Sequence, residues 1–136
     1  MTDQELRNIF SAIKTIAVVG VSQNQDKPAY GVASYLQSVG YKIVPVNPAC
    51  DETLGEKCYP TLEEIPFPVD AVDVFRKSEF TPEIARSAVK IGAKLLWLQD
   101  GVSSEEAEQI ARNADISFKQ NDCMFRQRVR LFGFGK

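Results

Sequence analysis

Short apolar runs alternate with amphipathic segments along the whole chain. Five runs have the length of strands and no helical period, at residues 15–21, 42–47, 71–75, 94–98 and 116–118. Between and beside them, apolar residues recur every three or four positions, which is typical of helices that bury one face. We therefore expect helices at residues 2–13, 28–39, 62–65 and 124–132, and two more that begin at residue 81 and at residue 103 or 104.

This alternation predicts an α/β fold of the Rossmann-like, doubly wound class, with a mostly parallel five-stranded sheet and helices on both faces. At 136 residues the chain is expected to form a single domain, residues 1–136. With the strands numbered along the chain, we expect the order 3-2-1-4-5 and a switch point between strands one and four. Pro45 lies inside the second strand and suits an edge, a bulge or a strand end better than a strand centre.

Local chemistry predicts how several helices begin and which side chains they expose. Thr2 or Asp3 can cap the first helix. Thr81 can cap the helix that begins there, and Ser103 or Ser104 can cap the helix after that one. The last helix carries three spaced arginines that we expect to face solvent: Arg126, Arg128 and Arg130.

The first strand runs into a glycine turn at Gly20 and Ser22, and a helix starts soon afterwards at Pro28. In doubly wound folds this first turn is where the phosphates of a nucleotide meet a helix N-terminus. Gly31 lies in the first turn of that helix, where glycine costs about 1 kcal/mol relative to alanine. A close approach by the strand or by a ligand would account for it.

Ligands of such sheets bind at the carboxyl ends of the strands, so the strand tips are the candidate site. These tips are Gly20 to Ser22, Asn47-Pro48, Phe75-Arg76 and Gln99 to Gly101. Lys27, just before the second helix, and Arg76 can bring positive charge to phosphates; the alternative for both is a solvated surface charge. The Ser22 hydroxyl can donate to a phosphate or serve only the turn itself.

The turn lacks the features of a dinucleotide site. An NAD site requires Gly-x-Gly-x-x-Gly and an acidic residue at the tip of the second strand, but Ser22 and Asn47 occupy those positions. The neutral Asn47 can hydrogen-bond a ribose or an adenine edge. The P-loop pattern is also missing. The residues therefore predict a phosphate site that is not built for NAD.

Several stretches, taken in order, carry a family resemblance. VVGVS at 18–22, KPAYG at 27–31, GYKIVPVNP at 40–48, LWLQDG at 96–101 and Asp122-Cys123 resemble the CoA-binding domain family. That family is related to the N-terminal domain of the succinyl-CoA synthetase α subunit and of the NDP-forming acyl-CoA synthetases. The resemblance extends from Lys14 to the last helix.

The resemblance implies coenzyme A as the ligand, with its diphosphate at the glycine turn, its adenosine over the tip of the second strand and its pantetheine arm beyond the third and fourth strands. The residues implied are Gly20, Val21, Ser22, Gln23, Lys27, Gly31, Asn47, Pro48, Phe75, Arg76, Gln99 and Gly101. Two positions depart from the family's usual pattern. Val21 replaces an alanine and would narrow the pocket if it points at the ligand, and Asp122 replaces an arginine, which removes an anion contact.

Composition excludes several classes of function. A net charge of −2 gives no basic field for nucleic acid, and no apolar run approaches the length of a membrane span. The chain has no histidine, which removes histidine bases, triads, histidine zinc sites and phosphohistidine. Cys50 and Cys58 lack zinc-ligand spacing, so we expect no metal site. The three cysteines suit reduced thiols in a cytoplasm.

Two residues near the predicted site have chemistry of their own. Cys123 is expected to be a buried structural cysteine; the alternative is a mixed disulfide with the CoA thiol. Asp100 could act as a general base near a thioester or simply cap a loop or helix. We assign a catalytic role to neither.

Three functions remain open from the sequence. The first is a stand-alone protein that binds CoA or acyl-CoA and has no complete catalytic apparatus. The second is a small NAD(P)-binding oxidoreductase, for which 136 residues leave little room for a substrate domain. The third is the CoA-binding subunit of a split acyl-CoA synthetase. Whether the chain forms a homodimer or joins a synthetase partner is left open.

Overall fold

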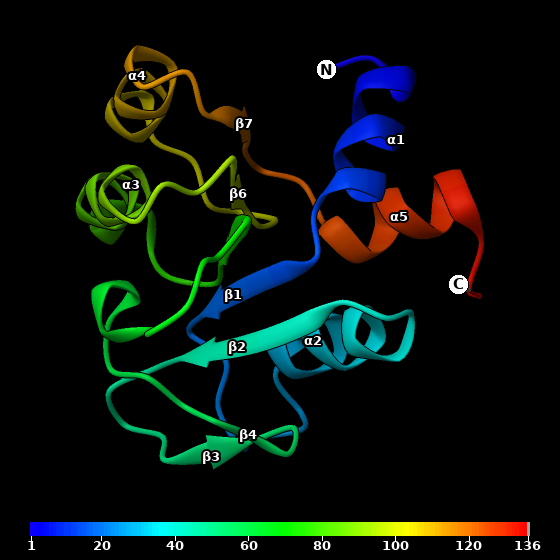
Figure 1. The fold of residues 1–136 in the computed structure, drawn as a ribbon, viewed down its shortest axis with the longest axis vertical. Coiled ribbons are helices and arrows are strands. Elements are labelled where there is room, and N and C mark those ends of the chain that lie inside the picture. Colours follow the sequence, from blue (N-terminus) through cyan, green and yellow to red (C-terminus); the bar gives the residue numbers. More distant parts are fainter. Residues whose placement is uncertain (136) are drawn as a thin grey trace.

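A parallel five-stranded sheet forms the centre of the protein in the computed structural model, which describes residues 1–135 (Figure 1). Every neighbouring pair of strands is parallel. The strands lie in the order β2 (Lys42–Val46), β1 (Thr15–Val19), β5 (Ala71–Val74), β6 (Leu95–Leu98) and β7 (Ser117–Lys119). The predicted Rossmann-like α/β class with five parallel strands is confirmed.

The predicted strand order is wrong. Counted along the chain, the order is 2-1-3-4-5 rather than 3-2-1-4-5, so the switch point lies between β1 and β5. Pro45 gives the physical reason, because it has no N–H to donate and is tolerated best in an edge strand. The observed order puts β2 at the edge of the sheet, whereas the predicted order would have enclosed it between two strands.

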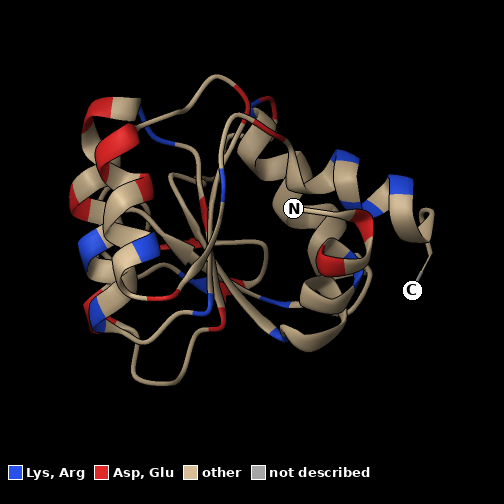
Figure 2. Cartoon of the chain, turned by 90° about the horizontal axis from the view of Figure 1, so that it is seen from above, with Lys and Arg blue, Asp and Glu red and all other residues tan. Residues whose placement is uncertain are grey.

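Helices cover both faces of the sheet (Figure 1). One face carries α1 (Asp3–Ala12), α2 (Pro28–Ser38) and α5 (Met124–Phe132). The other carries α3 (Thr81–Lys90), α4 (Glu105–Asn113) and the 3-10 helix η1 (Leu62–Glu64), while a second 3-10 helix, η2 (Ser78–Phe80), leads into α3. Figure 2 views the two helical layers from above and shows both signs of charge on each. Within residues 1–135, no helix is long and apolar enough to cross a membrane.

Alternating side chains of the strands build the two cores. In β1, Ile16 and Val18 pack against the layer of α1, α2 and α5, whereas Ala17 and Val19 pack against the layer of α3 and α4. All four are buried, because successive side chains of a strand point to opposite faces and helices cover both faces of this sheet. The strand tips are thereby held in fixed positions between two packed layers.

A short hairpin follows β2 where the sequence predicted a loop. Its strands are β3 (Glu52–Thr53) and β4 (Glu56–Lys57), and it lies beyond the β2 edge of the sheet (Figure 1). The chain leaving it pairs with β2 through a bridge between Val46 and Tyr59. Two-residue strands carry too little apolar periodicity to be seen in the sequence.

Four predictions about helices have definite outcomes. Thr2 caps α1 in a full capping box with Glu5, and the Ser104 hydroxyl caps α4 by accepting from the Ala107 N–H at 3.1 Å. Thr81 is not a cap, because it is the first residue of α3 and Phe80 holds the cap position. The expectation that Arg128 faces solvent is also wrong, since Arg128 is buried.

Candidate ligand-binding site

The turn after β1 brings two strands unusually close together. Gly20 has φ 101° and donates its N–H to the Val46 carbonyl at 2.9 Å. A Cβ added to Gly20 would lie 2.5 Å from the Phe75 carbonyl oxygen. Glycine is therefore required here both by the backbone angle and by the absence of space for a side chain. The predicted tight turn at the end of the first strand is confirmed.

Side chains from three segments brace the turn. Asn47 donates its Nδ2 to the Val21 carbonyl at 3.2 Å and accepts from the Ala49 N–H at 2.9 Å, so both ends of its amide are engaged. The Thr53 hydroxyl of the hairpin donates to the Ser22 carbonyl at 3.0 Å. The Ser22 Oγ accepts from the Asn24 N–H at 3.1 Å, which leaves its O–H proton available for a ligand.

A cavity of about 690 Å³ opens at the carboxyl ends of β1, β5 and β6, on the α2 side of the sheet. Predicted site residues from all four strand tips meet in it. They are Gly20, Ser22, Lys27, Asn47, Phe75, Arg76, Gln99 and Gly101. Cys123, weighed from the sequence as a residue near the site, also lines the cavity. Sequence reasoning missed Pro28, Ala29, Val32, Lys77 and Val102, most of which directly follow a predicted residue or lie one helical turn beyond it.

The other predicted site residues lie elsewhere. Val21 is fully buried in the core beneath α2, so it does not narrow the cavity. Gln23 points to the hairpin, where its Nε2 donates to the Glu52 carbonyl at 2.9 Å. Gly31 is exposed and a Cβ there would meet nothing within 4 Å, so no close approach by the strand explains this glycine. Pro48 lines a second cavity.

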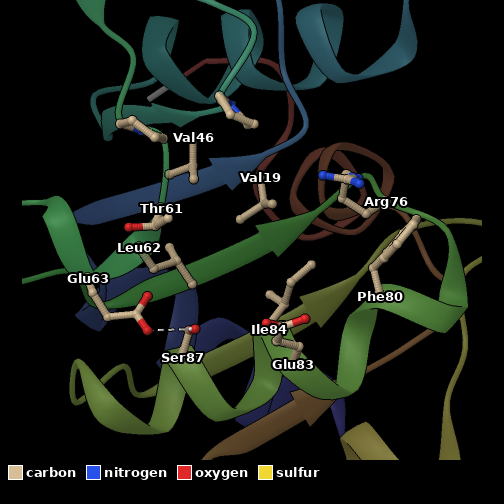
Figure 3. A pocket seen from close by; sticks show the side chains of 12 residues that line it. Val19, Val46, Thr61, Leu62, Glu63, Arg76, Phe80, Glu83, Ile84 and Ser87 are labelled. Carbon is tan, nitrogen blue, oxygen red and sulfur yellow. Dashed lines mark hydrogen bonds between the residues drawn. The ribbon is translucent and has the colours of Figure 1, made fainter.

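This second cavity, of about 320 Å³, lies on the α3 side of the same strand tips (Figure 3). Val19, Val46 and Leu62 form part of its apolar wall, and Ser87 hydrogen-bonds Glu63 at 3.0 Å beside it. Arg76 lines both cavities, and its guanidinium carbon lies 4.6 Å from the centroid of the Phe80 ring. The two cavities therefore meet at one arginine.

Unpaired positive charge surrounds the larger cavity. Lys27, Arg76 and Lys77 line it, and among residues 1–135 none of them has a carboxylate oxygen within 4.0 Å. Lys27 holds the cap position of α2 and Pro28 follows, so the positive end of the helix dipole is directed to the same place. Cations, a helix N-terminus and a tight turn are the elements of which phosphate sites are built.

Comparison with known proteins identifies the family of the chain. The sequence model of the CoA binding domain matches residues 14–128, which is most of the chain. The chain belongs to the CoA-binding domain family.

Relatives of this CoA-binding domain include short proteins and much longer ones. It is 42% identical over 120 residues to the uncharacterized protein YneT of Bacillus subtilis, covering 88% of this chain and 89% of YneT. It is 31% identical over 134 residues to the ADP-forming acetate–CoA ligase II of Archaeoglobus fulgidus, covering 97% of this chain but only 19% of the ligase. A hypothetical protein from Pyrococcus horikoshii OT3 superimposes with a TM-score of 0.95 at 40% identity, covering 98% of this chain and 94% of that one.

The carboxylates near the cavity of the CoA-binding domain are tied to cations. Asp100 accepts from Arg126 at 2.8 and 3.0 Å, and these hydrogen bonds lower its pKa. The Asp122 carboxylate accepts from Arg126 at 2.8 Å and from Gln127, and it lies 3.3 Å from the Lys119 ammonium. Asp122 is thus occupied within the protein, and Asp100 is held in its ionised form, which makes it a weak base.

Cys123 is not the buried cysteine that was predicted. It is half-buried and lines the cavity beside Gly101 and Val102. It directly precedes α5 and holds the cap position of that helix.

A buried acid beneath the cavity was missed by the sequence reasoning. Asp73 in β5 is fully buried and accepts from the Gln99 Nε2 at 2.6 Å through Oδ1, while its Oδ2 has no hydrogen-bond partner among residues 1–135. Burial raises the pKa of Asp73 to about 7. Gln99 is itself a lining residue, so Asp73 fixes the orientation of one wall of the cavity. The signal was an acid inside an otherwise apolar strand.

Proposed function

We propose that this protein binds CoA or an acyl-CoA across the two cavities and that these 136 residues carry out no reaction by themselves. The observation that carries the proposal is the cluster of Lys27, Arg76 and Lys77, without carboxylate partners, around a glycine turn and a helix N-terminus in a CoA-binding domain. Such an arrangement favours a ligand with several phosphate charges.

The diphosphate of the ligand fits best at the turn. There the Ser22 hydroxyl has a proton to donate, the Lys27 ammonium has no carboxylate partner among residues 1–135, and α2 directs its N-terminus toward the cavity. A phosphate oxygen at this position would receive charge-assisted hydrogen bonds, which are about twice as strong as neutral ones.

The rest of the ligand is distributed between the two cavities. Adenosine would lie in the smaller one, against Pro48 and the apolar wall at Val46, with Arg76 between it and the turn. Pantetheine would extend through the larger one past Gln99 and Gly101 toward Cys123. Both volumes lie in or near the range of sites for small ligands, roughly 300–1,000 Å³, and a long ligand such as CoA can use both.

The proposal of binding without catalysis rests on the side chains present. The 136 residues contain no histidine, and the lining carboxylate Asp100 is held ionised by Arg126. Without histidine, these residues offer no phosphohistidine, and an ionised Asp100 paired with Arg126 is a poor general base. We also propose a cytoplasmic location, because the three cysteines are free thiols.

A second candidate is a CoA-binding subunit of a split acyl-CoA synthetase. The observation that favours it is that the chain corresponds to about 19% of the ADP-forming acetate–CoA ligase II of Archaeoglobus fulgidus, which leaves most of that protein without a counterpart here. A partner polypeptide would then supply the remaining chemistry. Co-purification from the native source at endogenous level, followed by mass spectrometry, tests this candidate.

Isothermal titration with CoA, acetyl-CoA, NAD⁺ and NADPH tests the leading proposal. We expect CoA or acetyl-CoA to bind and the two dinucleotides to bind more weakly, because Asn47 lacks the charge of a ribose-binding acid. Lys27→Ala should weaken binding, whereas Lys90→Ala, at the exposed end of α3 away from both cavities, should not. Tighter binding of NAD⁺ than of CoA would contradict the proposal.

A further inference from the structure

Two thiols lie in contact at the base of the β3–β4 hairpin. The Sγ atoms of Cys50 and Cys58 are 2.9 Å apart, with the Cys58 thiol donating to the Cys50 sulfur. Both cysteines are free and both are buried, with 8% of Cys50 and 5% of Cys58 exposed. Neither sulfur lines the proposed CoA site, so that function leaves the pair unexplained.

The backbone holds the two cysteines in this position. The Cys58 N–H donates to the Asp51 carbonyl at 2.9 Å and the Cys50 N–H donates to the Asn47 carbonyl at 3.3 Å. The antiparallel pairs of the hairpin, Glu52 with Lys57 and Thr53 with Glu56, close the intervening segment. Because a disulfide joins its sulfurs at about 2.05 Å, the pair can be bonded after a movement of about 0.9 Å.

We propose that Cys50 and Cys58 are an oxidation site, at which a hydroperoxide converts the two thiols into an intrachain disulfide. Hydrogen peroxide is small enough to reach a sulfur that is only slightly exposed, whereas bulkier disulfide reagents are excluded by the same burial. This proposal goes beyond CoA binding and does not depend on it.

The reaction proceeds in two balanced steps. The Cys50 thiolate, its proton lost to water, attacks one peroxide oxygen, the O–O bond breaks, and hydroxide leaves, giving a sulfenic acid at Cys50. The Cys58 sulfur then attacks the Cys50 sulfur, the S–O bond breaks, and the hydroxide leaves as water with the proton of Cys58. Overall, two thiols and one hydroperoxide (here hydrogen peroxide) give one disulfide and two waters.

The surroundings distinguish the two sulfurs. Cys50 is the slightly more exposed residue, and its sulfur accepts from Cys58 while its own thiol donates to the Glu52 carbonyl at 3.5 Å. Burial raises the pKa of Cys58 to about 12, which keeps Cys58 protonated until the sulfenic acid has formed beside it. Cys50 therefore reacts first and Cys58 resolves the intermediate.

The disulfide would form next to the glycine turn. The same hairpin supplies Thr53, whose hydroxyl donates to the Ser22 carbonyl, and Glu52, whose carbonyl accepts from the Gln23 side chain. A covalent link between Cys50 and Cys58 closes the segment that carries both contacts. The modification thus acts on the brace of the turn and not on the sheet.

Titration of thiols with a chromogenic disulfide in denaturant, together with intact mass, tests the proposal on the full chain. After hydrogen peroxide treatment of the reduced, folded protein we expect the three thiols of the sequence to fall to one and the mass to fall by about 2 Da, with both changes reversed by dithiothreitol. Peptide mapping of the wild type should find Cys50 joined to Cys58.

Variants separate the pair from Cys123. Cys123→Ser should still form the disulfide and retain no free thiol, while Cys58→Ser should stop at a sulfenic acid on Cys50, which dimedone labels when the protein is unfolded in its presence. Peptide mapping of the wild type decides the matter even if Cys58→Ser does not fold. The proposal is overturned if the folded wild type keeps all three thiols, or if its disulfide joins Cys123 or a second chain.

Discussion

The carbonyl oxygen of Phe75 lies where a side chain on residue 20 would have to begin, 2.5 Å from the position of a Cβ on Gly20. The end of β1 and the end of β5 pass each other at this point, which is the switch point of the sheet. The geometry of the Gly20 turn therefore depends directly on how closely β1 and β5 pack against each other.

Gly20→Ala is expected to destabilise the protein and to weaken CoA binding. Both the positive φ and the clash with the Phe75 carbonyl oppose a side chain, and we expect a loss of about 2–4 kcal/mol in the free energy of unfolding. Gly40→Ala is the matched control, since Gly40 has φ 109° but a Cβ there meets nothing within 4 Å. Urea unfolding measures both; equal losses would show that the clash with Phe75 is not decisive.

Arg76→Ala is expected to weaken CoA binding about 10–100-fold, since a charge-assisted hydrogen bond to a phosphate contributes about 1.5–3 kcal/mol. Arg86→Ala serves as control, because Arg86 is exposed on α3 and paired with Glu106. Isothermal titration at two salt concentrations gives the affinity and its salt dependence. An unchanged affinity for Arg76→Ala would show that the ligand does not pass between the two cavities.

Asp73 is expected to make the stability of the protein fall as the pH rises. Its pKa is raised from 3.8 to about 7 in the folded state, so between these values the folded chain binds a proton that the unfolded chain has lost. The wild type should therefore lose stability from about pH 4 to pH 7 and level off above, by at most about 4 kcal/mol for a shift of about three pKa units.

Asp73→Asn tests this dependence because the amide mimics the protonated acid. Urea unfolding at pH 5 and at pH 8 should find the variant close to the wild type at the lower pH and more stable at the higher one. The Gln99 contact at Oδ1 is retained by asparagine. A variant that is less stable than the wild type at pH 8 would mean that the ionised carboxylate is satisfied in the folded protein.

Arg128→Ala is expected to cost about 2–4 kcal/mol of stability. Its guanidinium donates to the Tyr41 hydroxyl at 3.3 Å and to the Tyr35 hydroxyl at 3.1 Å, and its removal leaves a buried gap between α5 and α2. Arg130→Ala, which breaks an exposed pair with Asp3 and an exposed hydrogen bond to the Gln127 side chain, should cost less than about 1 kcal/mol. Thermal unfolding of both variants measures the two losses. A larger loss for Arg130→Ala than for Arg128→Ala would contradict this expectation.

The fold class could be predicted because strands and helices differ in apolar period, and a parallel sheet needs apolar strands. The strand order could not be derived from that pattern, although Pro45 already carried the decisive hint. Arg128 was misplaced for a geometric reason. Successive residues of a helix are about 100° apart, so Arg126 and Arg130 share a face while Arg128, two positions from each, points the other way.

The candidate site was predictable where it depends on strand tips, since parallel strands bring their carboxyl ends together. Lys27, Arg76 and Gln99 were found in this way. The direction of an individual side chain was not predictable: Val21 turns into the core, and Gln23 turns to a hairpin too short to show in the sequence. Asp73 was missed because it acts through Gln99 from beneath the cavity.

The hairpin β3–β4 adds no strand to the central sheet, yet it holds the turn through Ser22 and Gln23. The register of the five core strands is set by their pairing with one another, whereas the hairpin contributes Leu54 to the packing against the core. A chain with this architecture can alter its affinity for a ligand by substitutions outside both the cavity and the core. The hairpin thus links a surface segment to the geometry of the turn without joining the central sheet.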